Sequence, residues 1–440
     1  MASSGAEAPS DDDRAGTLMT VLRPAMITIL AAGTATLQAR QLLIAQTAKP
    51  MGEAAVMSAT AGLATAFSLG SFLEFLISPT YGKISDRFGR KPLFLSFLIG
   101  PALVRTLCVL ITNPYLRIRT LWIDFALARV IGVQPTMAAA GTMISDAVPV
   151  AAQPAARAQL NAAQALGQII GNYASGWWNT RAGPESTYVA TAIIPAVCFG
   201  VLGTCLSETH PSKQKAVAPA AAKAASTGET VATKSKSGAF STLLSDPECG
   251  FLALTIAGYE FIQWPPISTV SIIFMKERLG WGPLQAGRFA SGISSTVFVG
   301  SMLAARLLKL LGATTQVTLA HCCTFVAYSL WGTASSGKQM MLSLLPMVFS
   351  AGAKPSLETR FMARAASLGL GKGEAASVLQ ALGAASRIVA PQLFMRLYLR
   401  ATSGSGKGRM PMGSPMLLVA AMAVMQEVMH RASLSARGAQ

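Results

Sequence analysis

The sequence predicts an all-α membrane protein in which twelve transmembrane helices form two pseudo-symmetric six-helix halves. Three observations lead to this fold. Hydrophobic residues make up 52% of the chain and charged residues 12%, whereas soluble domains average about 25% charged residues. The apolar residues gather in runs of roughly 20, which is long enough to cross a bilayer as a helix. Six such runs precede a stretch rich in Ala, Lys, Ser and Thr, and six follow it.

Charged and proline-containing segments separate the predicted spans. In the first half the spans are 24–44, 58–79, 93–112, 121–144, 160–178 and 188–206. In the second half they are 251–274, 287–308, 317–335, 340–357, 375–399 and 415–429. The chain therefore divides into a disordered cytoplasmic tail (1–20), a first half (21–207), a cytoplasmic linker (208–245), a second half (246–430) and a cytoplasmic tail (431–440).

The net charge of +17 does not indicate nucleic-acid binding, because the basic residues are spread over many loops and form no single stripe. Lys and Arg are instead more frequent in the loops that twelve spans with both ends inside would place in the cytoplasm. The sequence therefore predicts a multi-pass integral membrane protein with both termini cytoplasmic. It does not indicate which membrane houses the protein.

The densest charge in the chain is the segment Gly82-Lys-Ile-Ser-Asp-Arg-Phe-Gly-Arg-Lys91, between the second and third spans. The pattern G-x-x-x-D-R-x-G-R-K resembles the loop between helices 2 and 3 of the major facilitator superfamily. In that family the loop controls conformational change and does not contact substrate. The resemblance implies a gating motif made of Gly82, Asp86, Arg87, Gly89, Arg90 and Lys91.

The resemblance covers most of residues 58–399. The segment 73–79 is similar to helix 2 of tetracycline-resistance-type drug/proton antiporters, and 128–132 resembles the R-x-x-x-G region of helix 4. The chain departs from the antiporter motif at Gly171-Asn172, where the family usually has Gly-Pro. It also has no acidic residue in spans 1 and 9, where the tetracycline proteins carry them. The resemblance implies secondary transport of a small organic solute by alternating access, with proton-coupled export.

Among the charged residues of the predicted spans, we single out two glutamates and three arginines. At about 1.5 Å per helical residue, Glu74 and Glu260 lie near the middle of the bilayer. Arg129, Arg105 and Arg387 lie at one level slightly outside it. An unpaired ion at this depth costs at least about 2.5–3.5 kcal/mol, so each should face a cavity or a partner. We assign proton coupling to Glu74, Glu260 and Arg129, with mutual ion pairing as the structural alternative.

The remaining polar residues of the spans are candidates for a substrate cavity. Arg105 and Arg387 could bind an anionic group, or pair with the glutamates. The other candidates could equally make hydrogen bonds between helices; they are Gln38, Gln263, Trp264 and Asn172.

No catalytic or metal site is predicted. The six cysteines have no metal-ligand spacing, and the histidines at 210, 321 and 430 are scattered. There is no Walker-type phosphate loop. We expect a monomer without cofactors, and its partners to be a small-molecule solute, protons and the lipid bilayer.

Two other functions fit the sequence. Three intramembrane arginines against two glutamates favour an anion carrier or facilitator without proton coupling. A membrane receptor or scaffold that no longer transports is the second alternative, although it would have little use for an intact gating motif.

Overall fold

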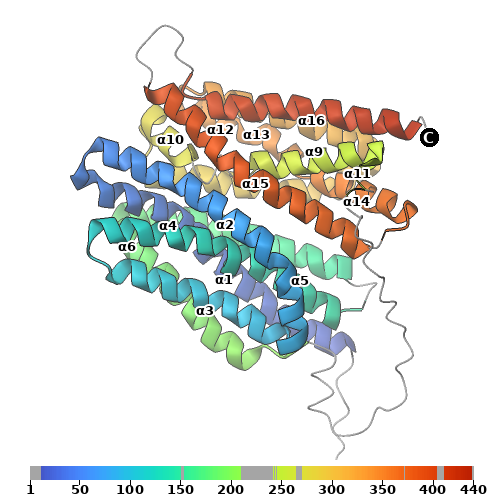
Figure 1. The fold of residues 1–440 in the computed structure, drawn as a ribbon, viewed down its shortest axis with the longest axis horizontal. Helices are drawn as coiled ribbons and strands as arrows, with labels where there is room; N and C mark the ends of the chain where they lie inside the picture. Colours follow the sequence, from blue (N-terminus) through green and yellow to red (C-terminus); the bar gives the residue numbers. More distant parts are fainter. Residues whose placement is uncertain are drawn as a thin grey trace, which may run out of the picture.

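The computed structural model is all-helical, and it describes residues 11–149, 153–209, 241, 243, 245–263, 270–370, 372–403 and 411–438. The helices before the linker form the lower part of Figure 1, coloured blue to green, and those after it form the upper part, coloured yellow to red. As far as the structure describes them, the twelve predicted spans fall on helices; residues 264–269 of the seventh lie outside the described part. Within the described residues, seven helices are long and apolar enough to cross a membrane, and one of them, Gln159–Cys205, contains two predicted spans.

The described part of the first half contains six α-helices and one short 3₁₀ helix. They are α1 (Asp11–Ala48), followed by the short η1 (Lys49–Met51), then α2 (Glu53–Phe88), α3 (Arg90–Leu110), α4 (Pro114–Ile131), α5 (Val133–Ala147) and α6 (Gln153–Cys205). Gly183 breaks α6 with a φ of 81°, so that α6 supplies spans 5 and 6. Span 4 is divided between α4 and α5 at Gly132. Asn113 caps α4 by accepting hydrogen bonds from two backbone N–H groups, and Pro114 follows at the first helical position.

The remaining described elements form the second half. Its elements are α9 (Pro247–Gln263), α10 (Ser271–Leu279), α11 (Pro283–Thr333), α12 (Gly337–Leu342), α13 (Leu344–Met347), η3 (Val348–Ser350), α14 (Ala353–Ser367), α15 (Lys372–Ser403) and α16 (Ser414–Gly438). Gly312 breaks α11 with a φ of 74°, so that α11 supplies spans 8 and 9. Span 10 is not one continuous helix, because α12, α13, η3 and α14 share it.

Some boundaries differ from those expected. Helix α1 begins at Asp11, inside the stretch predicted as a tail, and α16 continues to Gly438. Span 2 does not end at Pro79, because α2 continues through most of the charged motif to Phe88. The turn is then made at Gly89, whose φ of 107° lies in the region that favours glycine. The chain reverses at the same end at Gly312. We call this end of the molecule the motif end, and the end that holds Gly183 and Gly280 the opposite end.

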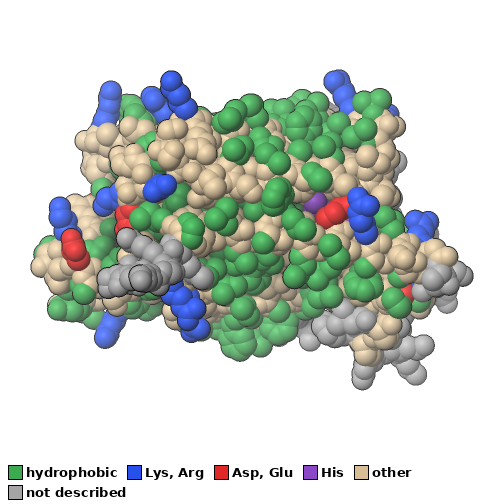
Figure 2. Space-filling view, turned by 90° about the horizontal axis from the view of Figure 1, so that it is seen from above, with side chains coloured by type: hydrophobic (Ala, Val, Ile, Leu, Met, Phe, Trp, Pro, Cys, Tyr) green, Lys and Arg blue, Asp and Glu red, His purple; other side chains and the backbone are tan. Residues whose placement is uncertain are grey.

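The surface fits a bilayer. Figure 2 shows apolar side chains over the middle of one face, with most Lys and Arg side chains nearer its edges. On α3, for example, Leu103, Leu107 and Leu110 are 59%, 55% and 70% exposed. A soluble protein rarely exposes such contiguous apolar surface, so these side chains are placed to face lipid.

Candidate functional site

Glu74, near the middle of α2, lies between two arginines. Arg129 Nη2 on α4 donates to Glu74 Oε2 at 2.9 Å, and Arg387 Nη2 on α15 lies 3.3 Å from Oε1. All three side chains are 11% exposed. Gly70, one turn before Glu74, lets α2 approach α4 closely, since a Cβ there would lie 2.5 Å from the Ala126 carbonyl oxygen. The sequence placed Arg129 and Arg387 at one level, and the structure brings both to Glu74.

Glu260 on α9 continues this network. Arg387 Nη1 lies 2.5 Å from Glu260 Oε2, and Lys354 Nζ on α14 donates to Glu260 Oε1. Lys354 Nζ also lies 3.8 Å from Glu358 Oε1, one turn further along α14. The exposed fraction of the side chains rises from 12% at Glu260 to 33% at Lys354 and 42% at Glu358. The network therefore leads from a buried centre to solvent.

These residues form what we call the charge chain. Three cations alternate with three carboxylates, so the chain is electrically balanced when all six groups are charged. Pairing of this kind offsets much of the cost of holding ions at membrane depth. Protonation of one carboxylate would remove a partner from one or two cations, so a single proton can change which ion pairs exist. In order, the members are Arg129, Glu74, Arg387, Glu260, Lys354 and Glu358.

Arg105 lies in a different cluster, which we call the Asp124 cluster. Arg40 Nε donates to Asp124 Oδ2 at 3.0 Å, Arg105 Nε lies 3.8 Å from Oδ1, and the Tyr188 hydroxyl also donates to this carboxylate. Arg105 additionally donates to the Thr191 carbonyl at 2.8 Å. The Arg40, Arg105 and Asp124 side chains are 3%, 5% and 2% exposed. Arg105 does not join Arg129 and Arg387, and its contacts are those of a buried ion cluster within the first half.

Gln38 and Asn172 meet at the junction of three helices. Gln38 Nε2 on α1 donates to Asn172 Oδ1 at 3.1 Å, and Asn172 Nδ2 on α6 donates to Ser294 Oγ on α11 at 3.2 Å. Both side chains therefore make the interhelical hydrogen bonds that the sequence offered as the alternative to a role in a substrate cavity. The Gln263 side chain and the whole of Trp264 fall outside the described residues.

Further contacts join the two halves between the middle of the molecule and the opposite end. Gln392 Nε2 on α15 donates to Thr65 Oγ1 on α2 at 3.1 Å. On the other side, Ser291 Oγ on α11 donates to the Ile169 carbonyl at 2.9 Å. Gly176 allows α6 to touch the start of α11, since a Cβ there would lie 2.7 Å from the Pro283 carbonyl oxygen. The halves are therefore closed against each other at this level.

Glu208 holds the turn of the gating motif. The backbone N–H groups of Arg90 and Lys91 donate to its carboxylate at 2.9 and 3.2 Å, which neutralises the positive end of α3. A Cβ at Gly89 would lie 2.4 Å from Glu208 Oε2, so a larger residue would displace this carboxylate in addition to straining φ. Sequence reasoning gave Glu208 no role beyond ending the first half.

The basic side chains of the motif bind neighbouring helices of the first half. Arg90 Nε donates to Asp146 Oδ2 on α5 at 2.7 Å and Arg90 Nη1 to Ser85 Oγ at 2.7 Å. Lys91 Nζ donates to the Gly203 carbonyl at 2.8 Å. Arg87 is exposed, with its guanidinium 5.4 Å from the ring of Phe88. Gly82 lies within α2, and the Asp86 side chain is outside the described part of the chain.

Two of the three histidines are not scattered in space. His321 on α11 and His430 on α16 have ring centroids 6.1 Å apart, and His321 Nδ1 lies 2.9 Å from Glu427 Oε2. Tyr259 stacks on His321 at 5.6 Å. The expectation of scattered histidines was wrong for this pair, because α11 and α16 pack side by side. Among the described residues no group of three or more His, Cys, Asp or Glu side chains could hold a metal ion.

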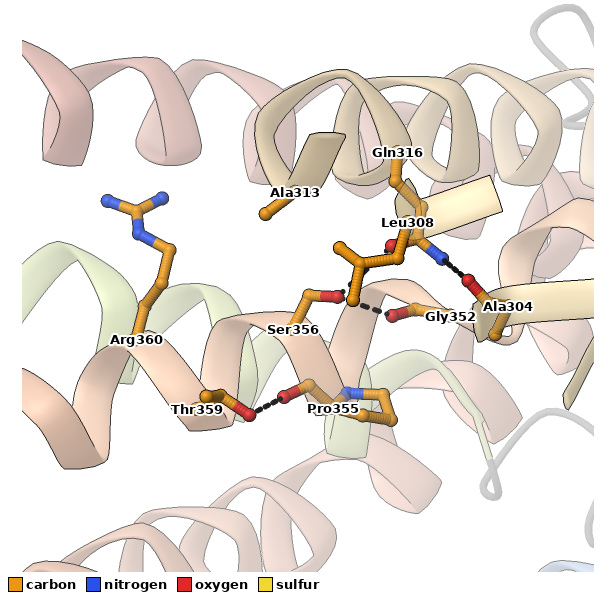
Figure 3. A pocket seen from close by; sticks show the side chains of 9 residues that line it. All are labelled: Ala304, Leu308, Ala313, Gln316, Gly352, Pro355, Ser356, Thr359 and Arg360. Atoms are coloured by element: carbon orange, nitrogen blue, oxygen red, sulfur yellow. Dashed lines mark hydrogen bonds between the residues drawn. The ribbon is translucent and has the colours of Figure 1, made fainter. Parts of the chain in front are cut away.

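A cavity of about 260 Å³ lies near the motif end between α11 and α14 (Figure 3). Gln316 crosses it, donating to the Ala304 carbonyl at 3.1 Å and accepting from Ser356 at 3.3 Å. No member of the charge chain lines this cavity. It is therefore separate from the candidate site.

Sequence reasoning missed Lys354, Glu358 and Asp124. Lys354 is the single ionisable residue of predicted span 10, as Glu74 is of span 2, and Asp124 is one of two in span 4, so the signal was present. Glu358 lies one residue beyond the predicted end of span 10. Arg40 was visible as a charge near the end of span 1, but nothing in the sequence indicated its partner.

Comparison with known proteins places the chain in a family. Residues 16–391 match the model of the Major Facilitator Superfamily. The chain is 24% identical to the tetracycline resistance protein, class B, of Escherichia coli, over 75% of this chain and 77% of that one. It is 25% identical to the class D protein of Salmonella ordonez, over 75% and 78%. The crystal structure of the human organic anion transporter MFSD10 (TETRAN) superimposes with a TM-score of 0.63 at 17% identity, covering 96% of this chain and all of that one.

The match to the family model spans most of the chain, and the gating motif, the helix order and the apolar surface agree with it. The chain therefore belongs to the Major Facilitator Superfamily and is a multi-pass membrane protein that transports a solute by secondary transport and is not an enzyme.

Proposed function

We propose that the protein exports a small organic solute in exchange for protons, by alternating access of two pseudo-symmetric six-helix halves. The observation that carries the proposal is the charge chain, whose Glu74–Arg387 pair joins α2 of the first half to α15 of the second. Rocking of the halves must stretch or break this pair. A proton on Glu74 weakens this pair, and a proton on Glu260 removes the second carboxylate that holds Arg387, so proton binding and rocking are linked.

The arrangement of the halves supports a state open toward the motif end. The contacts between the halves described above lie from the middle of the molecule to the opposite end, while Lys354 and Glu358 on α14, nearer the motif end, are partly exposed. By the excess of basic residues, the motif end and both termini are cytoplasmic. In this state solute would bind from the cytoplasm, with the gating motif bracing the first half. Likeness to the tetracycline resistance proteins supports export as the direction.

The structure gives less support to the anion-carrier alternative. That alternative was based on an excess of arginines, three against two glutamates, within the spans. Arg105 belongs to the Asp124 cluster, and Lys354 and Glu358 complete a balanced set with the remaining four groups. Arg129 and Arg387 are thus occupied by carboxylates and are not free to receive an anion in this state.

The test is a measurement of solute-driven pH change in liposomes that contain the purified protein. Tetracycline, benzoate and tetraphenylphosphonium serve as neutral-drug, anion and cation probes. We expect at least one probe to drive proton movement, and Glu74→Gln or Glu260→Gln to abolish it, because a glutamine cannot bind and release the proton. Glu53→Gln, which removes an exposed carboxylate at the start of α2, is the matched control and should behave as wild type.

Other outcomes select the alternatives. Probe flux without proton movement, unchanged in the double variant Glu74→Gln/Glu260→Gln, would support a facilitator. Probe binding with no flux under any gradient would support a receptor or scaffold.

A further inference from the structure

Lys354 holds a position between two carboxylates of different exposure. Its ammonium donates to Glu260, which is 12% exposed, and lies 3.8 Å from Glu358, which is 42% exposed. Lys354 and Glu358 are one turn apart on α14, so both face the same side of that helix. Glu260 and Glu358 thus share one cation as neighbour, and Glu358 is the more exposed of the two carboxylates.

Lysine suits this position in a way that arginine would not. Its ammonium is a compact group with three rotatable N–H donors on a flexible stem, and it can lose a proton. Arginine keeps its proton under all ordinary conditions. Both other cations of the charge chain, Arg129 and Arg387, are arginines, and each pairs with a carboxylate that is 11–12% exposed. The lysine therefore stands at the point where the chain meets solvent.

We propose that Lys354 relays protons between Glu260 and Glu358, which makes Glu358 the site where a proton is exchanged with water on the motif side. The inference rests on the proposed function, because it supplies the route by which a proton carried on Glu260 is released toward the motif end. In the loading direction, a hydronium ion first protonates Glu358 and becomes water. The Lys354 ammonium then gives one proton to the Glu260 carboxylate and receives one from the Glu358 carboxyl group. Lys354 ends as an ammonium, Glu358 as a carboxylate and Glu260 as a carboxyl group, so charge and protons balance. Release toward the motif side is the reverse sequence.

Breaks in the backbone before α14 fit this role. Span 10 is interrupted by η3, and Gly352 precedes α14 directly. A Cβ at Gly352 would lie 2.3 Å from Gln316 Nε2, so this turn packs closely against α11. Helix α14, which carries Lys354 and Glu358, starts directly after the turn. The proton on Glu260 would remove the carboxylate that Arg387 contacts at 2.5 Å. The relay therefore ends on Glu260, which contacts the same arginine, Arg387, that pairs with Glu74.

The experiment follows carboxyl protonation by infrared absorption after rapid acidification of the purified full-length protein, with no solute present. The Glu260 signal is the protonated-carboxyl band that Glu260→Gln lacks. In Lys354→Arg we expect this band to rise at least about 100-fold more slowly than in wild type, the usual scale of a lost acid–base group. Its final amplitude should be nearly unchanged, because the positive charge remains. Lys338→Arg, on exposed Lys338 of α12, is the matched control.

A wild-type rate in Lys354→Arg would overturn the relay and leave Lys354 as a fixed charge. Glu358→Gln provides an independent test if the first variant does not fold: it should slow the Glu260 band by a similar factor, and an unchanged rate would again contradict the proposal. The liposome assay separates the two claims. If the infrared test shows that Glu260 is protonated through Lys354 but solute drives no proton movement in liposomes, proton coupling is disproved and the relay stands.

Discussion

Replacing Arg387 by methionine is expected to destabilise the protein by about 3–5 kcal/mol, the usual cost of removing one member of a buried ion pair. Arg387 contacts Glu74 at 3.3 Å and Glu260 at 2.5 Å, so its loss leaves the charge chain with one excess negative charge. Thermal unfolding of the detergent-purified protein measures the effect. Arg396→Met changes an exposed arginine of the same helix and should have little effect.

A charge-balanced double variant distinguishes ion pairing from simple packing. Arg387→Met combined with Glu260→Gln again has equal numbers of cations and carboxylates. It should recover a large part of the lost stability, although solute-driven proton flux should stay absent. If the double variant is less stable than Arg387→Met alone, charge balance is not what Arg387 provides.

Replacing Asp124 by asparagine should produce the second large effect. The carboxylate accepts from Arg40 at 3.0 Å and from the Tyr188 hydroxyl and lies 3.8 Å from Arg105. Asparagine keeps the shape of the side chain but leaves two buried guanidinium groups without a counter-charge. We expect a loss of about 3–5 kcal/mol, measured by thermal unfolding as above.

Asp146→Asn is the control for Asp124. Asp146 also accepts from an arginine, Arg90 at 2.7 Å, but its side chain is 20% exposed and lies at the motif end. A pair closer to water should contribute only about 0–1 kcal/mol. Equal melting temperatures for the two variants would show that the Asp124 cluster does not hold α1, α3 and α4 together.

The helices could be predicted from the sequence because membrane helices carry their signal in composition. Each span needs a run of apolar residues, and the charged segments between the runs mark the ends. The finer boundaries could not be read in this way. Helix α2 continues beyond Pro79 to Phe88, because a helix that leaves the bilayer keeps its own hydrogen bonds and can tolerate charged side chains. The turn is fixed by Gly89 and by the carboxylate of Glu208, which comes from far along the chain.

The candidate site could be predicted in part. Counting residues along a helix gives the depth of a side chain but not the direction in which it points. Depth alone placed Arg105 with Arg129 and Arg387, whereas the structure turns it toward Asp124. The same limitation hid the pairing of His321 with His430. Lys354 carries the same kind of signal as Glu74, because it is the single ionisable residue of predicted span 10.

The central claim is that protons on the charge chain change the arrangement of the halves, and distances between spin labels test it directly. One label pair, at Phe88 and Ser367, spans the halves at the motif end. A second pair, at Arg119 and Lys338, spans them at the opposite end. All four residues are exposed, and the labels are introduced in a background in which the two exposed native cysteines are replaced by serine.

Acidification should weaken the Glu74–Arg387 pair and with it the arrangement seen in this structure. We expect the motif-end distance to shorten and the opposite-end distance to lengthen at acidic pH, and Glu74→Gln to show the acidic distances already at alkaline pH. If both distances are the same at acidic and alkaline pH, in wild type and in Glu74→Gln, protonation of the charge chain does not drive alternating access and the account is wrong.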